Sequence, residues 1–463
     1  MKFGLKWTAA AVLFGALAGA GAQQNWTVKP EWVTAHEKFL SSDVLAGRGS
    51  ATRDEELAAT YVASQFEGYG LKAAPGMSGY LQAAEVIAPE LDGKATLEAG
   101  ASLQEGQDFV LLTSPGDSAA GPLVRVKASE MPSAHIEPGS AVLLTGFDDP
   151  TALFRAVSAL RRAGAALVLA PETPALSSLP VMLGGKTRVS VRLAEDAPRK
   201  SPSVILLHAD AAAKLTAAEG SKITLTVHAK PLEKPRQTFN AIGYLPGSDP
   251  KAGTILLTAH LDHLGVGRPV DGDAIYNGAN DDAAGTTAVL ELAHALAAGP
   301  QLKRSVLFVC YGSEELGELG STYFGKHPPV PLTELVANLE FEMIGSQDPK
   351  MPAGVLLLTG WDRSNFGPTL KEHGALLGPD PYPEEHFFER SDNYALALQG
   401  VIAHTAAGWG TVPTYHRPND DMAHLDVPFM ARAIQSLIEP LRWLADSDFR
   451  PQWNPGGAPT AGH

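Results

Sequence analysis

The sequence is poor in cysteine and in positive charge. Cys310 is the only thiol in 463 residues, which excludes an internal disulfide and any metal site built from several cysteines. Because it lies in the apolar run 305–311, we expect Cys310 to be a buried core residue. Only 36 Lys and Arg residues stand against 51 Asp and Glu residues, which gives a formal net charge of −15. This balance argues against nucleic acid or an anionic membrane as a partner.

Long apolar runs are also scarce. One such run, residues 8–18, follows Lys2 and Lys6 and is followed by Ala20-Gly21-Ala22. A basic start, a short apolar segment and small residues are typical of a secretory signal peptide. We therefore predict that residues 1–22 are a signal peptide and that the protein is exported, either to a periplasm or out of the cell. The alternative is an uncleaved membrane anchor. No other stretch is long and apolar enough to cross a bilayer.

The composition, 44% hydrophobic and 19% charged, is that of a folded chain with a large core, and the length favours two or three domains. Residues 30–72 have the spacing of two helices. Residues 96–235 read as short β runs rich in Ala, Gly, Ser and Pro, with one helix at 152–164 and no dense cluster of ligand-type residues. The last residues, 447–463, are rich in Pro and Gly, so we expect a disordered tail.

After residue 239 the pattern changes to strands that alternate with helices. Such alternation favours an α/β fold with a mostly parallel sheet covered by helices on both faces. The expected strands are 254–258, 305–311, 335–342 and 400–405, and the expected helices are 283–298 and 431–444.

Carboxylates and histidines follow these strands, at the sheet edge where α/β proteins bind ligands. Each signal alone fits a solvated loop. If these charged side chains converge at one sheet edge, they would repel one another unless cations lay between them. Imidazole and carboxylate without thiolate suit catalytic zinc, and two metals can act together in hydrolysis. The residues concerned are His260, Asp262, His263, Asp281, Asp282, Glu314, Glu315, Glu340, Glu342, Tyr415 and His416.

Four motifs occur in order, and together they resemble a known family. They are Thr258-Ala-His-Leu-Asp-His-Leu-Gly265, Gly278-Ala-Asn-Asp-Asp-Ala-Ala-Gly285, Glu314-Glu-Leu-Gly-Glu-Leu-Gly-Ser321 and Tyr415-His-Arg-Pro-Asn-Asp420. This set resembles the co-catalytic di-zinc exopeptidases related to bacterial leucyl aminopeptidase, glutamate carboxypeptidase II and the transferrin receptor. Residues 42–49 resemble the start of that catalytic domain.

The resemblance implies a discontinuous catalytic domain, residues 23–95 and 236–446. Its fold would be the zinc exopeptidase (phosphorylase/hydrolase-like) sheet sandwiched by helices. Residues 96–235 would be an inserted, β-rich domain similar to the protease-associated domain. We further hypothesise that this insert caps the cleft and limits substrate size.

The matched positions imply roles for individual residues. Two Zn²⁺ ions per chain would be held by five ligands, with the carboxylate of Asp281 bridging them: His260, Asp281, Glu315, Glu342 and His416. Asp262 would orient the imidazole of His260. Glu314 would be the general base that activates a metal-bridging water, and the hydroxyl of Tyr415 would stabilise the oxyanion.

One ligand position departs from the family pattern, which reads Asn-Leu-Asp-Met-Ile-Gly. This chain has Asn338-Leu-Glu-Phe-Glu-Met-Ile-Gly345, so either Glu340 or Glu342 could be the ligand, and both lie on one strand face. We choose Glu342 because it is nearer the strand end. Asp392 is a weaker candidate on the substrate side. We interpret His263, His404 and His424 as structural histidines, because none of them matches a ligand position.

These features predict a secreted zinc aminopeptidase that acts on peptides with a free N-terminus. Phe387, Phe388 and Trp409 hint at an apolar substrate pocket. Two alternatives on the same fold are a carboxypeptidase and a glutaminyl cyclase. A carboxypeptidase needs cations to bind the substrate carboxylate. The chain offers three candidates for that role, Arg363, Arg390 and Arg417, so this alternative stays open. An inert, receptor-like binding protein is the third alternative, and it would be expected to lack ligands.

Overall fold

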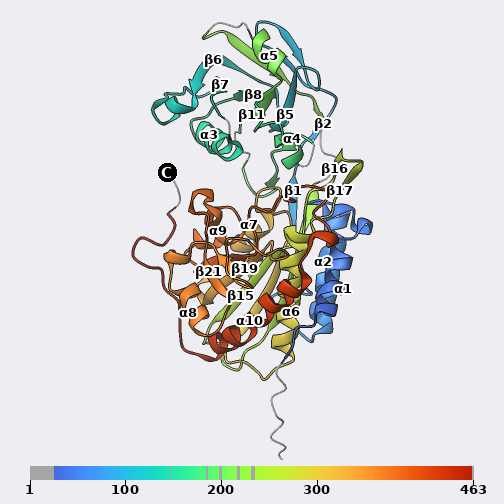
Figure 1. The fold of residues 1–463 in the computed structure, drawn as a ribbon, viewed down its shortest axis with the longest axis vertical. Coiled ribbons are helices and arrows are strands. Elements are labelled where there is room, and N and C mark those ends of the chain that lie inside the picture. The colour runs from blue at the N-terminus through green and yellow to red at the C-terminus, as the bar shows by residue number, and fades with distance from the viewer. Residues whose placement is uncertain are drawn as a thin grey trace, which may run out of the picture.

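The chain folds into two lobes, as seen in a computed structural model (Figure 1). The structure describes residues 26–147, 149–183, 186–197, 201–215, 219–230 and 235–460. The predicted signal peptide lies outside these residues. Within the described residues, no helix combines the length and the apolar character that crossing a bilayer requires.

The larger lobe is built on a nine-stranded sheet with the order β10-β1-β14-β18-β15-β19-β22-β20-β21. Its centre consists of four parallel strands, β18 (Ser305–Tyr311), β15 (Thr254–His260), β19 (Leu335–Glu342) and β22 (Ala403–Ala407). Antiparallel pairs flank this centre. The flanking strands are β1 (Leu81–Ile87), β10 (Arg192–Leu193), β14 (Arg236–Leu245), β20 (Leu356–Leu358) and β21 (Leu377–Pro379).

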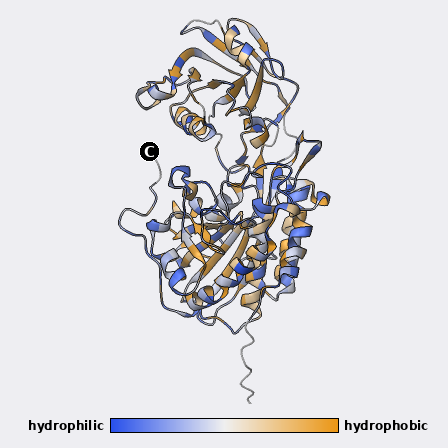
Figure 2. Cartoon of the chain, in the orientation of Figure 1, coloured by the Kyte–Doolittle hydropathy of each residue, from blue (hydrophilic) through white to orange (hydrophobic). Residues whose placement is uncertain are grey.

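Helices cover both faces of this sheet, as the sequence predicts. Ile255 and Leu257 of β15 pack in one core with α6 (Ala284–Ala297) and α10 (Val427–Asp446), whereas Leu256 packs in another core on the opposite face. Alternate side chains of a strand point to opposite faces, so a strand buried on both sides is apolar throughout. The apolar strands accordingly lie inside the lobe (Figure 2). The first face also carries α1 (Pro30–Leu40), α2 (Arg53–Gly68) and α8 (Phe366–Glu372), and the second carries α7 (Leu319–Lys326) and α9 (Asn393–Ala397).

The smaller lobe, which we call the insert lobe, has its own nine-stranded sheet, with the order β4-β3-β12-β6-β7-β8-β11-β5-β9. The chain enters this lobe after β1 and returns through β14, and these two strands are antiparallel neighbours. One short strand, β10, lies within the predicted insert yet pairs with β1 in the larger sheet. The elements of the insert lobe are β3 (Thr96–Glu98), β4 (Ser102–Gln104), β5 (Phe109–Ser114), β6 (Ala119–Lys127), β7 (Ala141–Thr145), α3 (Pro150–Arg162), β8 (Leu167–Pro171), α4 (Leu179–Met182), β9 (Arg188–Val189), β11 (Ser203–Leu207), α5 (Ala209–Lys214) and β12 (Lys222–Thr226).

Two small ribbons complete the fold. The first pairs β2 (Glu90–Leu91) with β13 (Ala229–Lys230), beside the two chain crossings into the insert lobe. The second pairs β16 (Gly265–Val270) with β17 (Asp273–Tyr276) and follows the strand β15.

The segment 447–460 is ordered, so the expectation of a disordered tail is wrong for these residues. Trp453 pairs with Ser364 in a β-bridge and packs against the rings of Phe388 and His404. The main chain is also tied down, because Asn454 N donates to the carbonyl oxygen of Arg363 at 2.8 Å. Buried aromatic surface outweighs the Pro and Gly content here.

A buried carboxyl group on α1 gives a stability prediction. Glu37 is fully buried, and burial raises its pKa from 4.5 to about 8, against the opposing effects of Thr287 and Arg48. Between these two pH values the folded chain holds a proton that the unfolded chain has lost, so folding loses about 1.4 kcal/mol per pH unit. We expect Glu37→Gln to remove this loss and to raise Tm over wild type at pH 8, with a smaller gain at pH 5.

The exposed Glu31 on the same helix provides the control for this measurement. Glu31→Gln should leave the pH dependence of Tm unchanged. Parallel Tm curves for wild type and Glu37→Gln from pH 5 to pH 8 would contradict the assignment.

Candidate active site

The five expected ligands come from segments at or beyond the carboxyl ends of the strands. His260 is the last residue of β15 and Glu342 is the last residue of β19. Glu315 lies in the loop after β18, Asp281 lies in the turn before α6, and His416 lies in the loop after β22. Parallel strands bring their carboxyl ends to one edge, which explains how residues far apart in sequence converge here.

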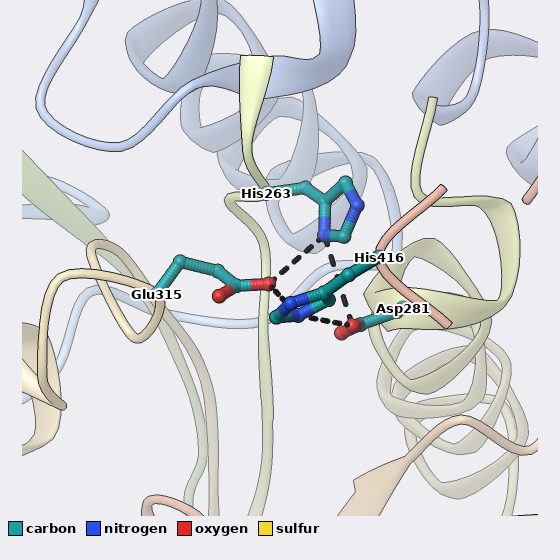
Figure 3. Close-up of side chains that lie close together, drawn as sticks. All are labelled: His263, Asp281, Glu315 and His416. Carbon is teal, nitrogen blue, oxygen red and sulfur yellow. Dashed lines mark ion pairs between the residues drawn. The ribbon is translucent and has the colours of Figure 1, made fainter. Parts of the chain in front are cut away.

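The first group of converging side chains contains His263, Asp281, Glu315 and His416 (Figure 3). His416 Nε2 lies 2.8 Å from Glu315 Oε1 and 3.2 Å from Asp281 Oδ2. His263 Nδ1 lies 3.1 Å from Glu315 Oε1 and 3.8 Å from Asp281 Oδ2. All four side chains are buried. Two imidazoles and two carboxylates therefore face one small volume.

The second group contains His260, Asp281 and Glu342. His260 Nε2 lies 3.2 Å from Asp281 Oδ1. Asp281 belongs to both groups, with Oδ2 directed at the first and Oδ1 directed at the second. One carboxylate thus joins two candidate cation sites, the arrangement expected of a bridging ligand.

The residues present fit a pair of zinc ions. Within each group, the candidate ligand atoms lie within 4.8 Å of one another. His260 Nε2, both ring nitrogens of His263 and Glu315 Oε1 are buried and make no hydrogen bond. Buried polar atoms without partners are rare in folded proteins, and atoms of this kind that converge mark a place for a cation. The donor set, imidazole and carboxylate without sulfur, suits zinc.

The electrostatics of the first group also favour a bound cation. Burial opposes a charge on His416, but Glu315 and Asp281 outweigh burial and raise the pKa of His416 to about 10. The histidine thus holds a proton to offset the negative charge around it. A divalent cation would replace that proton and use the freed nitrogen as a ligand.

Hydrogen bonds from the main chain fix the carboxylates around the two groups. Asp420 accepts from the backbone nitrogens of Asn280 and Asp281, at 2.9 and 3.0 Å, and so holds the turn that presents Asp281. Asp262 accepts from the backbone nitrogens of Glu314 and Glu315, at 3.0 and 3.3 Å. It therefore organises the loop that carries both glutamates.

Asp262 lies beside the imidazole of His260 with both its main chain and its carboxylate. The His260 ring atom Nδ1 lies 3.2 Å from the main-chain oxygen of Asp262 and 3.8 Å from its carboxylate atom Oδ1. The main-chain oxygen is therefore the nearer partner. The carboxylate also holds the 314–315 loop, and the hydroxyl of Ser50 donates to it at 2.5 Å.

Glu314 and Tyr415 lie beside the two groups. Burial raises the pKa of Glu314 well above its usual value, with His260 opposing and Glu315 adding to the effect. A carboxylate of this kind can accept a proton and later release it. The ring of Tyr415 stacks on that of His416, with centroids 3.8 Å apart. Tyr415 also lines a hollow of about 70 Å³ together with Glu342, Met343 and Phe387.

Glu340 is placed apart from the second group. Its carboxylate accepts hydrogen bonds from Ser391 Oγ at 2.6 Å, from Asn393 N at 2.5 Å and from Thr405 Oγ1 at 3.1 Å. Glu340 is therefore committed to the protein, whereas Glu342 belongs to the group with His260 and Asp281.

The two glutamates form a matched pair for a metal-content experiment. We expect Glu342→Gln to lose one of two zinc ions on dialysis, because an amide is a weaker metal ligand than a carboxylate. Glu340→Gln should keep both ions but lower stability by about 1–3 kcal/mol, because the amide NH₂ would meet hydrogen-bond donors. Zinc per chain by mass spectrometry and Tm would be measured together, and the reversed pattern would favour Glu340 as the ligand.

The insert lobe reaches into the first group. His416 Nδ1 lies 2.8 Å from the carbonyl oxygen of Met182, at the end of α4. A main-chain oxygen at this ring atom directs Nε2 toward the other ligand atoms. Arg188 Nη2, on β9, lies 3.1 Å from Glu315 Oε2. Neither contact has a sequence signal, since the insert shows no cluster of ligand-type residues.

His263 faces Glu315 and Asp281 and lies in the first group of ligand-type side chains, which its interpretation as a structural histidine does not anticipate. The sequence offers a signal for this placement, since His263 lies within the motif 258–265, directly after Asp262. His404 is a core histidine as expected, with Nε2 2.7 Å from Ser364 Oγ. His424 pairs with Asp421 outside the site. Asp392 is buried and belongs to neither group.

Comparison with known proteins gives a family match and fold relatives. Residues 240–439 match the model of Peptidase family M28. Leupeptin-inactivating enzyme 1 of Streptomyces exfoliatus is 35% identical over 165 residues, which are 35% of this chain and 34% of that protein. A probable leucine aminopeptidase 2 of Aspergillus oryzae is 28% identical over 243 residues, 46% of this chain and 45% of that protein. The chain thus spans less than half the length of these curated relatives.

Solved structures resemble nearly the whole chain. An aminopeptidase from Aneurinibacillus sp. strain AM-1 has a TM-score of 0.60 and 22% identity, covering 90% of this chain and 94% of that one. A zinc aminopeptidase from Bacillus subtilis, BSAP, has a TM-score of 0.58 and 19% identity, covering 90% and 96%. At such identities the likeness establishes the fold.

Proposed function

Because residues 240–439 match the model of Peptidase family M28, we propose that this chain is a member of that family and an exported zinc aminopeptidase. The observation that carries the proposal is Asp281, whose two carboxylate oxygens face two separate groups of ligand-type side chains. The names of the curated relatives, among them a leucine aminopeptidase, support the same activity. Export rests on the predicted signal peptide, residues 1–22.

In this proposal, one zinc ion is held by Glu315, His416 and Asp281, with His263 beside them, and the other by His260, Glu342 and Asp281. Bound zinc supplies Lewis acidity, which polarises the scissile carbonyl and lowers the pKa of water to about 7. Glu314 takes a proton from the attacking water and passes it to the leaving amine. Tyr415 donates from its hydroxyl to the developing oxyanion.

The charge around the second group suits a cationic N-terminus. Burial raises the pKa of Glu342 to about 7 and that of Glu318 to about 8, so an ammonium group would restore the charge on these carboxylates. The small hollow beside Glu342 is lined by Met343 and Phe387, which favours an apolar first side chain.

The three arginines that would favour a carboxypeptidase either lie close to glutamates or are exposed. Arg363 lies 3.6 Å from Glu389, and Arg390, which lines the small hollow, lies 3.3 Å from Glu385. Arg417 is exposed. None of these three is a free cation within the site.

A set of aminoacyl p-nitroanilides, with zinc quantified in the same samples, tests the proposed function. We expect hydrolysis of leucine p-nitroanilide, loss of activity after dialysis against a chelator, and recovery on adding Zn²⁺. N-acetyl-leucine p-nitroanilide is the control and should not be hydrolysed. Preference for the blocked substrate, or full activity without metal, would overturn the proposal.

A further inference from the structure

A large hollow of about 610 Å³ lies between the two lobes, on the side of the first ligand group. His263 and Glu315 form part of its wall, so it opens directly onto that group. Apolar surface comes from Leu183 of the insert lobe and from Val191 and Leu316, which pack together in a cluster of the larger lobe. The hollow is therefore large enough for part of a substrate and adjoins the proposed reaction centre.

Three cationic side chains line this hollow: Lys186, Arg188 and Arg236. Lys186 Nζ donates to the carbonyl oxygen of Leu264 at 3.3 Å, and it forms no ion pair with any described carboxylate. Burial lowers the pKa of Lys186, and Arg188 and Arg236 lower it further. Arg236 likewise has no ion pair among the described residues. The chain as a whole has a net charge of −15, so a local cluster of cations favours the binding of an anionic ligand.

The acids in the same wall do not neutralise these cations. Glu315 Oε2 is engaged by Arg188, while its Oε1 faces the two histidines of the first group. Glu90 lies 3.9 Å from Lys230. Asp54 also lines the hollow, without an ion pair to a described cation. Lys186 and Arg236 thus remain available to a ligand.

The two sides of the site have opposite character. Around Glu342 lie Glu314 and Glu318, both close enough for their charges to interact with that of Glu342. Around Glu315, toward the insert lobe, lie Lys186, Arg188 and Arg236. A molecule that spans the two groups meets acid at one end and base at the other. A short peptide has the matching polarity, with an ammonium at its N-terminus and a carboxylate at its C-terminus.

Resting on the proposed function, we propose that the hollow binds the free C-terminal carboxylate of a dipeptide or tripeptide, with Lys186 and Arg236 as its cationic partners. The scale of the site supports short peptides. Arg188 lies 3.1 Å from Glu315, so the cationic wall begins directly beside the proposed reaction centre, and each extended residue spans only about 3.5 Å. The enzyme is then a peptidase that completes the breakdown of small peptides left by other proteases.

Paired substrates that differ only at the C-terminus test the inference. The ratio of kcat/KM for Leu-Leu over Leu-Leu-amide should be about 10 in wild type, which corresponds to about 1.4 kcal/mol. Lys186→Met and Arg236→Met should each lower this ratio by about threefold, mainly through KM for the free acid. Lys222→Met is the control, because Lys222 is exposed on β12 away from the hollow, and it should retain the wild-type ratio.

The outcomes separate this inference from the proposed function. Hydrolysis of leucine p-nitroanilide with a Leu-Leu to Leu-Leu-amide ratio near 1 would overturn the carboxylate site and leave the aminopeptidase standing. A ratio near 10 that neither variant changes would also overturn the site. Absence of hydrolysis of every unblocked substrate, with zinc bound, would instead overturn the proposed function. Zinc content and Tm of each variant show that the variant is folded.

Discussion

Replacing Glu314 with Gln should lower kcat by about a thousandfold while both zinc ions stay bound. Glu314 belongs to neither group of ligand-type side chains, so we expect the variant to keep its zinc. Its raised pKa fits a group that accepts a proton from water and returns it to the leaving amine, and general acid–base catalysis of this kind contributes about 10²–10⁴ in rate. Gln keeps the shape but cannot accept the proton.

Steady-state kinetics with leucine p-nitroanilide and zinc counts on the same samples provide the measurement. Glu334→Gln is a suitable control, since Glu334 is exposed at the opposite end of the sheet, before β19. If Glu314→Gln retained full activity, the general base would have to be another group. If it lost zinc, Glu314 would be a ligand.

Replacing Asp281 with Asn should have an even broader effect, because it removes the charge that the two groups share. We expect zinc to fall from two ions per chain to fewer than one, and activity to fall roughly a thousandfold or more, since metal ions supply several kcal/mol of transition-state stabilisation. Loss of the other candidate ligands should affect one ion more than the other. Asp281 alone faces both groups.

Zinc titration of the apoprotein, followed by calorimetry, measures this effect. Asp273→Asn changes the charge equally on the exposed ribbon strand β17 and should bind two ions normally. Two tightly bound zinc ions in Asp281→Asn would show that the Asp281 carboxylate is not needed to bind either ion. That result would contradict the proposal that Asp281 bridges two zinc sites.

Much of the larger lobe is predictable because its strands are continuous apolar runs. The expected strands 305–311 and 335–342 coincide with β18 and β19, since parallel strands buried on both faces leave an unmistakable pattern. The segments that carry the ligand-type residues follow from the same logic, because each of them lies at or just beyond a strand end. Local sequence therefore predicts which side chains gather at this edge.

Contacts that depend on how the two lobes meet are not predictable in this way. Met182 acts through its main-chain oxygen, which any residue could supply, and Arg188 lies in a two-residue strand. The preference of His260 for the main-chain oxygen of Asp262 likewise depends on a loop geometry that spacing alone does not encode. The choice of Glu342 over Glu340 rested on nearness to the strand end, and the hydrogen bonds made by Glu340 give it a physical reason.

The pairing of β1 with β14 has a consequence for engineering. Val86 lies opposite Arg236 in antiparallel register, so an Asn-Gly hairpin turn could join the two strands directly and bypass the insert lobe. The shortened protein would keep the helices and central strands of the larger lobe, but His416 would lose its Met182 acceptor and the candidate site would open to bulk water. Comparison of this shortened chain with the full chain would separate the contribution of the insert lobe to zinc binding from its contribution to substrate selection.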